Sequence, residues 1–271
     1  MKRRSTLWLA LAILTAATPG MSDAETVVNV FAAGSLRASL TEIAQTFETE
    51  TPSASVVFVF GASGLLKDRL LAGEQASLFA SANMDHPQAL LADGRAASVA
   101  PFTRNRLCVL ARPGLALTSD TVVQRMLDPE VKVGISTPKA DPSGDYAFEL
   151  FDRVEASGSA APGSAAKLKA KALQLTGGPL SPTPPAGQSV YAAMLAERQA
   201  DLFVTYCTNA VSARQERAGL QIVDVSPQIN VSATYGLAVL READPVAQRF
   251  AAYLSGSTAQ GILRRNGFAE L

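Results

Sequence analysis

The sequence has few of the residues that build metal sites. It contains one histidine and two cysteines, which lie in separate segments. Protein zinc sites use clusters of cysteine and histidine at short spacings, so we expect no metal ligated directly by side chains. The cysteines, Cys108 and Cys207, both lie in runs typical of strands. In an oxidising compartment they could form one disulfide or remain two buried thiols, and the sequence leaves both states open.

Long apolar runs are missing beyond the first residues. The chain starts with MKRR, continues with an apolar run over residues 7–17 and reaches S-D-A before Glu25. These features are typical of a secretory signal peptide. No later stretch approaches the roughly 18 uninterrupted apolar residues of a membrane span. We therefore expect a soluble protein exported to the periplasm, without a lipid anchor because neither cysteine lies near the cleavage site.

An excess of charge of one sign is also missing. The chain has 24 basic and 24 acidic residues, and removal of residues 1–24 leaves a net charge of about −2. There is no basic block, and the aromatic content is 6%. Nucleic acid is therefore not an expected partner. The mature length fits two modest domains or one large one.

The common enzyme signatures are not found either. The stretch GASGLL has neither the glycine spacing of a dinucleotide site nor the lysine of a P-loop, and no G-x-S-x-G motif occurs. His86, the only histidine, precedes Pro87 at a predicted helix start, where a solvated loop residue is the simpler interpretation. We predict no enzyme and no cofactor. An exported hydrolase is the alternative, with His86 as its best base.

Apolar runs rich in β-branched residues alternate with helical patterns. The runs are VVNVF, SVVFVF, RLCVLA, VKVGIS, DLFVTY and YGLAVL. This alternation predicts an α/β fold with mainly parallel sheets covered by helices on both faces. The first predicted helix has one apolar face, formed by Leu36, Leu40, Ile43, Ala44 and Phe47. The segment 157–187, rich in Gly, Ser, Ala and Pro, predicts an exposed connection around a short helix.

Two serine-containing turns follow consecutive predicted strands. AAGS ends at Ser35 and GASG contains Ser63, and we predict both serines as helix N-caps, with Thr208 capping a later helix. A helix N-terminus exposes unpaired N–H groups and a partial positive charge, so it attracts anions. In open α/β sheets, ligands bind at the carboxyl ends of the strands. The two turns together therefore indicate an anion site.

Several segments, in their order along the chain, resemble the periplasmic molybdate-binding proteins of ABC importers. VFAAGSLRASLTEIAQTFE is similar to the first strand and ligand loop of that family, and VFGASGLLKDRLLAGEQASLFASANMDHPQAL to its second loop. ADPSGDYA is similar to its P-A-G-x-Y-A segment, SVYAAMLAERQADLFVTYCTNA to its V-x-x-A-L…G-I-V-Y-x-[ST]-D-A segment, and NGFAEL to its G-F terminus. The resemblance covers essentially the whole mature chain.

The resemblance implies a ligand site made of uncharged donors. Ser35 and Ser63 would supply hydroxyl and backbone N–H groups, Ser143 and Val190 backbone N–H groups, and Tyr206 its hydroxyl. A fully deprotonated oxyanion has no proton to donate, so a cage of donors suits it. The implied ligand is molybdate or tungstate. The implied partners are the membrane permease and the ATPase of an importer, and the expected state is a monomer.

Some residues depart from the family pattern and keep other ligands open. Ser143 replaces an alanine and adds a hydroxyl, while Asp141 and Asp145 place carboxylates near the anion loop. Asn209 replaces the aspartate of [ST]-D-A. Sulfate remains an alternative, as does phosphate, whose proton Asp145 could accept. A small organic anion would require an arginine, such as Arg37 or Arg104.

The resemblance also implies a two-lobed periplasmic binding protein with two hinge crossings. The expected parts are the signal peptide over 1–24, lobe I over 25–105 plus 232–271, lobe II over 106–231, and crossings near 104–107 and 231–235.

Overall fold

The computed structural model describes residues 25–182 and 188–271. The predicted signal peptide, residues 1–24, lies outside these ranges. Within them, no helix has both the length and the apolar character that a membrane span requires.

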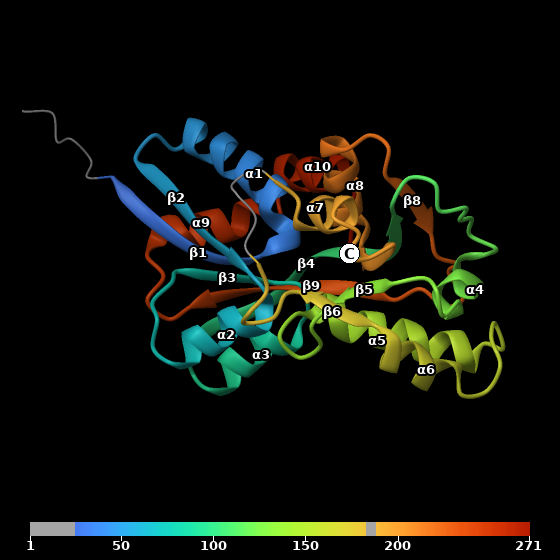
Figure 1. The fold of residues 1–271 in the computed structure, drawn as a ribbon. Helices are drawn as coiled ribbons and strands as arrows, with labels where there is room; N and C mark the ends of the chain where they lie inside the picture. Colours follow the sequence, from blue (N-terminus) through green and yellow to red (C-terminus); the bar gives the residue numbers. More distant parts are fainter. Residues whose placement is uncertain (1–24, 183–187) are drawn as a thin grey trace, which may run out of the picture.

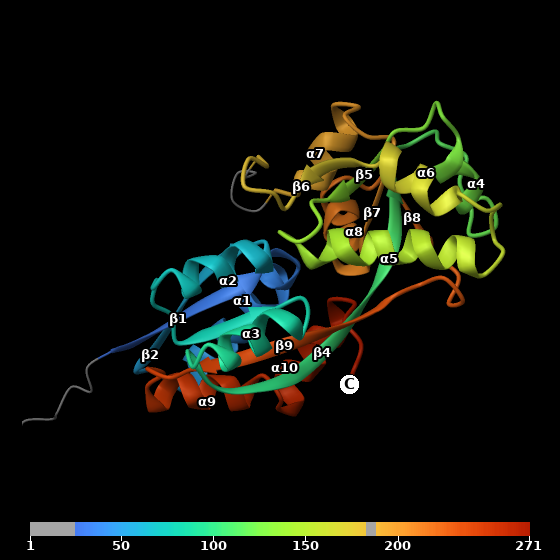
Figure 2. The same ribbon diagram turned by 90° about the horizontal axis from the view of Figure 1, so that it is seen from below.

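Figure 2 shows two α/β bodies joined by the strands β4 and β9. We call them lobe I and lobe II and define them by their elements. Lobe I contains β1 (Thr26–Ala33), the 3-10 turn η1 (Gly34–Leu36), α1 (Arg37–Glu50), β2 (Ala54–Gly61), α2 (Ser63–Leu71), β3 (Leu78–Ser81), α3 (Asp85–Ala92), α9 (Pro245–Tyr253) and α10 (Ser257–Arg265). Lobe II contains α4 (Val122–Leu127), β5 (Val133–Ser136), α5 (Pro142–Ala156), α6 (Ser164–Lys171), β6 (Leu173–Thr176), α7 (Val190–Ala196), β7 (Leu202–Tyr206), α8 (Cys207–Glu216) and β8 (Gln221–Asp224). The connecting strands are β4 (Ala96–Ala111) and β9 (Ser232–Leu240).

The sheets are mixed, which corrects the prediction of mainly parallel sheets. The strand order is β2-β1-β3-β9-β4-β7-β5-β6, and β8 also pairs with β4. Strands β2, β1 and β3 are parallel to one another, as are β6, β5 and β7. Strands β4 and β9 pair antiparallel, both with each other and with the strands beside them. They run in opposite directions because one takes the chain out of lobe I and the other returns it.

Strand β4 changes its partner part way along its length. Its residues up to Arg106 pair with β9, and from Leu107 onward it pairs with β7, with Leu107 opposite Tyr206. A single continuous strand therefore serves both lobes. The residue limits given above for the lobes remain a prediction, and we use the element assignment instead.

The predicted amphipathic helices pack as their patterns indicate. The five apolar residues of the 36–47 stripe are all buried, as are Ala147, Leu150, Phe151 and Val154 on α5. In Figure 1, α1, α9 and α10 cover one face of the lobe I strands, and α2 and α3 cover the other. Gly73, with φ of 104°, follows α2 in the left-handed conformation expected of a terminating glycine.

Three short strands were not predicted. Strands β3, β6 and β8 have four residues each, too few to show a period. Of the segment 157–187, predicted as an exposed connection around a helix, residues 183–187 lie outside the described ranges. The described part contains that helix, α6, but also β6, which adds to the edge of the lobe II sheet.

Candidate functional site

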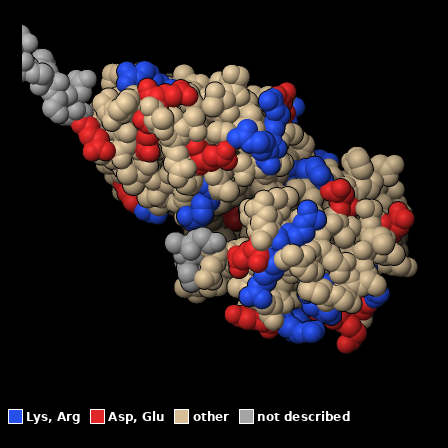
Figure 3. All heavy atoms as spheres, turned by 90° about the horizontal axis from the view of Figure 1, so that it is seen from above, with Lys and Arg blue, Asp and Glu red and all other residues tan. Residues whose placement is uncertain are grey.

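The carboxyl ends of the parallel strands bring the predicted site residues to facing edges of the two lobes. In lobe I, β1 leads to Ser35, β2 to Ser63 and β3 to Ala82. In lobe II, Ser143 lies in the first turn of α5, and Tyr206 is the last residue of β7. Figure 3 shows a recess between the two bodies.

Hydrogen bonds, together with one contact between tyrosine rings, bring three of the five predicted residues into one cluster. The Tyr206 hydroxyl donates to the carbonyl oxygen of Ala82, at 3.3 Å, and the Ala82 N–H donates to Ser63 Oγ, at 3.1 Å. Ser35 Oγ lies 2.8 Å from the hydroxyl of Tyr235, whose ring centroid is 5.5 Å from that of Tyr206. Groups from both lobes therefore meet at one place, and we call Ser35, Ser63, Tyr206 and Tyr235 the hydroxyl cluster.

The prediction that Ser35, Ser63 and Thr208 are N-caps is wrong. Ser35 lies inside η1, Ser63 is the first residue of α2, and Thr208 is the second residue of α8, and no side-chain capping bond is made at any of these helix starts. The three hydroxyls instead bond to distant segments. Their hydroxyls form hydrogen bonds with Tyr235, Ala82 and Asn105, whereas the sequence pattern indicated bonds with the backbone of their own helices.

The N-terminus of α2 is in direct contact with lobe II. The Gly64 N–H donates to the carbonyl oxygen of Ala140, at 2.9 Å. A Cβ atom on Gly64 would lie 2.5 Å from Lys139 O and 2.6 Å from Ala140 O, distances that real Cβ atoms essentially never show. With the contact of Tyr206 to Ala82, this shows that the lobes are closed against each other.

Ser143 uses its N–H and its hydroxyl differently from the prediction, and no hydrogen bond among the described residues joins it to the hydroxyl cluster. Its N–H, expected to face a ligand, donates to Asp141 Oδ1 at 3.1 Å, because Asp141 is the N-cap of α5. Its hydroxyl is buried and, within residues 25–182 and 188–271, has no hydrogen-bond partner. A buried hydroxyl without a partner is costly, so this oxygen is a candidate donor to a bound molecule.

Val190 is not joined to the cluster by any hydrogen bond in the described part of the chain. It is the first residue of α7, whose N-cap Ser189 accepts from the Ala192 N–H at 3.3 Å. Its side chain packs beside the buried cluster that includes Tyr191 and Phe203. The ligand role of the Val190 N–H remains a prediction.

The sequence analysis did not assign three further residues to the site, although it named Thr208 as a helix cap. Tyr235, Asn105 and Thr208 are buried, and Asn105 Nδ2 donates to Tyr235 OH at 3.2 Å and to Thr208 Oγ1 at 2.9 Å. The available signal was a polar side chain inside an apolar strand, in TRNRLCVLA and SATYGLAVL. A buried polar group needs a partner, and here the partners are one another.

The tyrosine hydroxyls remain protonated donors at neutral pH. Burial raises the pKa of Tyr206 well above its usual value, and it also raises the pKa of Tyr235. On α5, burial raises the pKa of Tyr146 to about 12. No lysine or arginine side chain bonds to the hydroxyl cluster within the described residues. The site therefore offers neutral donors rather than cations.

The other residues singled out from the sequence lie outside the hydroxyl cluster. Asn209 donates to Tyr191 OH and Thr205 Oγ1, both at 3.1 Å. Asp145 Oδ1 accepts from the Lys139 N–H at 2.9 Å, while burial raises the pKa of its carboxyl. The Arg37 guanidinium lies 4.4 Å from the centre of the Phe60 ring.

His86 makes no side-chain hydrogen bond to a nucleophile among the described residues. In the described part of the chain its Nε2 is buried without a partner, and no hydrogen bond joins its imidazole to a serine, threonine or cysteine. Burial lowers the pKa of this imidazole. The arrangement lacks the contact between a base and a nucleophile that covalent hydrolysis requires.

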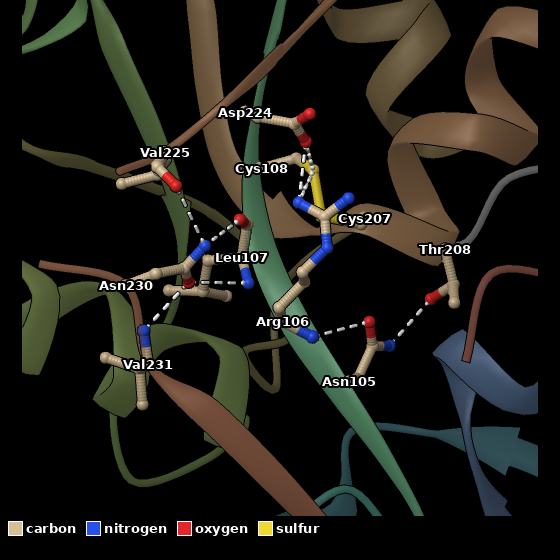
Figure 4. The surroundings of a disulfide bond; sticks show 10 residues. All are labelled: Asn105, Arg106, Leu107, Cys108, Cys207, Thr208, Asp224, Val225, Asn230 and Val231. Carbon is tan, nitrogen blue, oxygen red and sulfur yellow. Dashed lines mark hydrogen bonds and ion pairs between the residues drawn. A yellow bond between two sulfur atoms is a disulfide. The ribbon is translucent and has the colours of Figure 1, made fainter. Parts of the chain in front are cut away.

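The structure answers the question about the cysteines. Cys108 of β4 and Cys207, the first residue of α8, form a disulfide with their Cα atoms 4.8 Å apart. Asp224 lies beside them and pairs with Arg106 at 2.6 Å (Figure 4). The bond joins the crossing strand to the residue that follows Tyr206. Because both sulfurs are in the disulfide, they are not thiolate ligands for a metal.

The carboxyl of Asp141 should make stability depend on pH. Burial raises its pKa, and the hydrogen bond from the Ser143 N–H only partly opposes this effect. For a raised carboxyl pKa, the stabilising contribution is complete below the ordinary aspartate value of about 3.9 and is lost as pH rises through the native pKa. Asp141→Asn removes this loss and keeps a good N-cap. The stability of the variant minus that of the wild type, from urea unfolding, should therefore increase from pH 3 to pH 7.

Asp244→Asn is the matched control for this prediction. Asp244 is the N-cap of α9 and accepts from the N–H groups of Val246 and Ala247. The Asp244→Asn variant measures the effect of replacing an aspartate N-cap with an asparagine N-cap at a helix away from the hydroxyl cluster. If the stability difference between Asp141→Asn and the wild type does not change with pH, or changes as it does for Asp244→Asn, the Asp141 carboxyl is not the source of the pH dependence.

Sequence comparisons identify relatives over most of the chain. The family model described as "Bacterial extracellular solute-binding protein" matches residues 28–269. An uncharacterized protein of Pasteurella multocida, PM1146, is 37% identical over 212 residues, which cover 78% of this chain and 86% of that protein. The molybdate-binding protein ModA of Mycobacterium tuberculosis is 25% identical over 247 residues, covering 89% of this chain and 84% of ModA.

Solved structures share the fold. The periplasmic molybdate-binding protein of Azotobacter vinelandii has a TM-score of 0.70 at 20% identity, with 90% of this chain and 99% of that chain covered. The sulfate-binding protein SubI of M. tuberculosis has a TM-score of 0.75 at 14% identity, with 91% and 87% covered. These matches confirm the predicted two-lobed α/β fold.

Proposed function

Since the chain belongs to the bacterial extracellular solute-binding proteins of ABC transporters, we propose that it captures a tetrahedral oxyanion, molybdate or tungstate, between its lobes in the periplasm. The loaded, closed form would be recognised by a membrane permease with its ATPase. The protein would act as a monomer and without catalysis.

The hydroxyl cluster is the observation that carries this proposal. It joins hydroxyls of lobe I to Tyr206 of lobe II. Lobe II also holds the buried Ser143 hydroxyl on α5, which has no hydrogen-bond partner among the described residues. A dianion without protons can be held by converging neutral donors, because each charge-assisted bond is strong in a dry site. The sequence similarity to ModA supports molybdate among such anions.

Closure would follow from contacts that a ligand makes with both lobes at once. A ligand shifts an equilibrium only by its different affinity for the two states. Donors on the β1 and β2 turns and on β7 meet only when the lobes approach, so the anion would favour the closed form. Molybdate, tungstate and sulfate are all dianions, so discrimination among them would come from the size of the enclosed space.

Asp141 favours a second candidate, an oxyanion that carries a proton. Its carboxylate accepts from the Ser143 N–H and has a raised pKa because of burial. A carboxylate repels a dianion but can accept the proton of hydrogen phosphate. The sequence analysis assigned this role to Asp145. In the structure, Asp145 accepts a hydrogen bond from the Lys139 N–H, whereas Asp141 accepts one from the Ser143 N–H. We therefore assign the role to Asp141.

Calorimetric titration of the mature protein with molybdate, tungstate, sulfate and phosphate tests the proposal. We expect tight binding of tungstate and molybdate, with sulfate weaker by at least about 2.7 kcal/mol, a factor of about 100. Asp141→Asn should strengthen binding of a dianion, since a nearby negative charge is removed, and weaken binding of hydrogen phosphate. Equal affinity for sulfate would reject the named ligand, and the Asp141→Asn result would separate the two candidates.

Removal of single hydroxyls should lower the affinity. Ser35→Ala should cost about 1–3 kcal/mol of tungstate binding, the usual range for a bond to a charged group. Tyr206→Phe should also lower the affinity, because it removes the hydrogen bond to the Ala82 carbonyl oxygen that joins the two lobes in the closed form. Ser63→Ala should also lower the stability of the empty protein, because the buried Ala82 N–H would lose its acceptor. Titration and thermal unfolding of each variant measure both effects.

Ser39→Ala is the control for the serine variants. The Ser39 hydroxyl is buried in α1 and, among the described residues, has no partner, so its removal should leave the affinity unchanged. Equal losses for Ser39→Ala and Ser35→Ala would show that general packing, not ligand contact, controls binding.

A further inference from the structure

Asn105 is a buried amide on the crossing strand β4 whose orientation is fixed by its neighbour. Its side chain is almost fully buried, and its Oδ1 accepts from the Arg106 N–H at 2.9 Å (Figure 4). A backbone N–H can only donate, so the atom that faces it must be the carbonyl oxygen of the amide. The amide nitrogen therefore faces the opposite side.

The amide nitrogen of Asn105 determines that the hydroxyl oxygens of Tyr235 and Thr208 act as hydrogen-bond acceptors. It lies 3.2 Å from Tyr235 OH and 2.9 Å from Thr208 Oγ1. Because an amide NH₂ group donates and does not accept, both hydroxyl oxygens accept from Asn105. The hydrogen of the Tyr235 hydroxyl is then left for another acceptor.

Ser35 Oγ is the acceptor that suits this hydrogen, at 2.8 Å from Tyr235 OH. The Tyr206 hydroxyl directs its own hydrogen to the Ala82 carbonyl oxygen. If Ser35 accepts from Tyr235, the hydrogen of Ser35 points away from this fully buried tyrosine. Ser35 itself is partly exposed, so that hydrogen is available to a ligand.

We propose that Asn105 and Tyr235 are positioning residues that hold Ser35 as an obligatory hydrogen donor toward the ligand. The proposal rests on the proposed function and deepens it. An obligatory donor stabilises a deprotonated oxygen and leaves a ligand hydroxyl without an acceptor, so Ser35 selects oxyanions that are fully deprotonated at that position. Thr208 belongs to lobe II and Ser35 to lobe I. The Asn105 amide contacts Thr208 directly and Ser35 through Tyr235, so the orientation of Ser35 depends on groups from both lobes.

The hydrogen bonds that run from Asn105 through Tyr235 to Ser35 are called the relay below. Neutron diffraction from crystals of the deuterated, ligand-free wild type tests the direction of these bonds. We expect the deuterium of the Tyr235 hydroxyl on the line to Ser35 Oγ, and the two amide deuterons of Asn105 toward Tyr235 and Thr208. A deuterium of Ser35 directed at the Tyr235 oxygen would overturn the proposal. This measurement needs neither a variant nor a known ligand.

A double-mutant cycle on binding tests the consequence. Asn105→Asp replaces the donor with a carboxylate that only accepts, so Tyr235 would donate to it and Ser35 would have to donate to Tyr235. We expect about 10- to 100-fold weaker tungstate binding in the wild-type background, the range for one lost bond to a charged group. In the Ser35→Ala background we expect little further loss. An equal loss in both backgrounds would show a simple charge effect and overturn the proposal.

Asn230→Asp is the matched control for the added charge. Asn230 also lies at the crossing, where its amide bonds to the backbone of Leu107, Val225 and Val231 and not to Tyr235 (Figure 4). Its effect on affinity should be the same with and without Ser35. If the wild type binds none of the four anions, the proposed function fails while the neutron result still decides the relay. If the wild type binds and Ser35 donates to Tyr235, the relay alone fails.

Discussion

Replacement of Gly64 by alanine should disfavour closure while leaving the empty protein at least as stable as the wild type. The added Cβ would lie 2.5 Å from Lys139 O and 2.6 Å from Ala140 O. Both are backbone atoms that cannot rotate away, so the lobes must separate to relieve the overlap. Overpacking of this kind costs about 1–3 kcal/mol. The cost applies to the closed state alone, and we expect ligand affinity to fall by about 10- to 100-fold.

The stability of the same variant should change in the opposite direction. Gly64 lies in the first turn of α2, and alanine is favoured over glycine inside a helix by up to about 1 kcal/mol. Calorimetric titration would measure the loss of affinity, thermal unfolding would measure the stability, and small-angle scattering would show whether added ligand still compacts the protein.

Gly261→Ala is the control for Gly64→Ala. Gly261 lies inside α10, and a Cβ there would meet only the ends of arginine side chains, at 3.8 Å and beyond. It should gain helix stability and keep the affinity. Unchanged affinity and compaction in Gly64→Ala would show that the contact between Gly64 and Ala140 is not part of the liganded state.

Removal of the disulfide should have the largest effect on stability. Cys108 and Cys207 are 99 residues apart in the sequence, and closing a loop of about 100 residues accounts for about 4.7 kcal/mol in the chain-entropy model. Loss of a native disulfide typically costs about 2–5 kcal/mol. We expect the Cys108→Ala/Cys207→Ala double variant to lose stability in this range, as measured by urea unfolding.

The same variant should also bind its ligand more weakly, because Cys207 lies between Tyr206 and Thr208. A reducing agent should lower the stability of the wild type toward that of the double variant and leave the variant itself unchanged. An equally large effect of reducing agent on the variant, or no difference between the two proteins in oxidising buffer, would contradict this account.

The sequence alone was sufficient for features that depend on neighbouring residues. The apolar stripe over 36–47 required a helix that buries one face, and the alternation of strands and helices required an α/β fold. The turns after β1 and β2 could be placed because a glycine and a serine lie at the carboxyl end of each strand. Since the carboxyl ends of parallel strands share an edge, Ser35 and Ser63 could be assigned to one region before any coordinate was known.

Features that depend on distant partners could not be predicted in this way. Local pattern made Ser35 a helix cap, but its hydroxyl bonds to Tyr235, 200 residues away. Asn105 and Tyr235 are 130 residues apart and meet because of the antiparallel register of β4 and β9. The contact of Gly64 with Ala140 exists only when the lobes are closed.

The periodicity of the chain thus determined which segments become helices and strands, because that choice is made by residues a few positions apart. Tertiary structure alone decided which partner each buried hydroxyl contacts and whether the two cysteines pair. A polar group that leaves water must bond to whichever partner the packing of both lobes brings within reach.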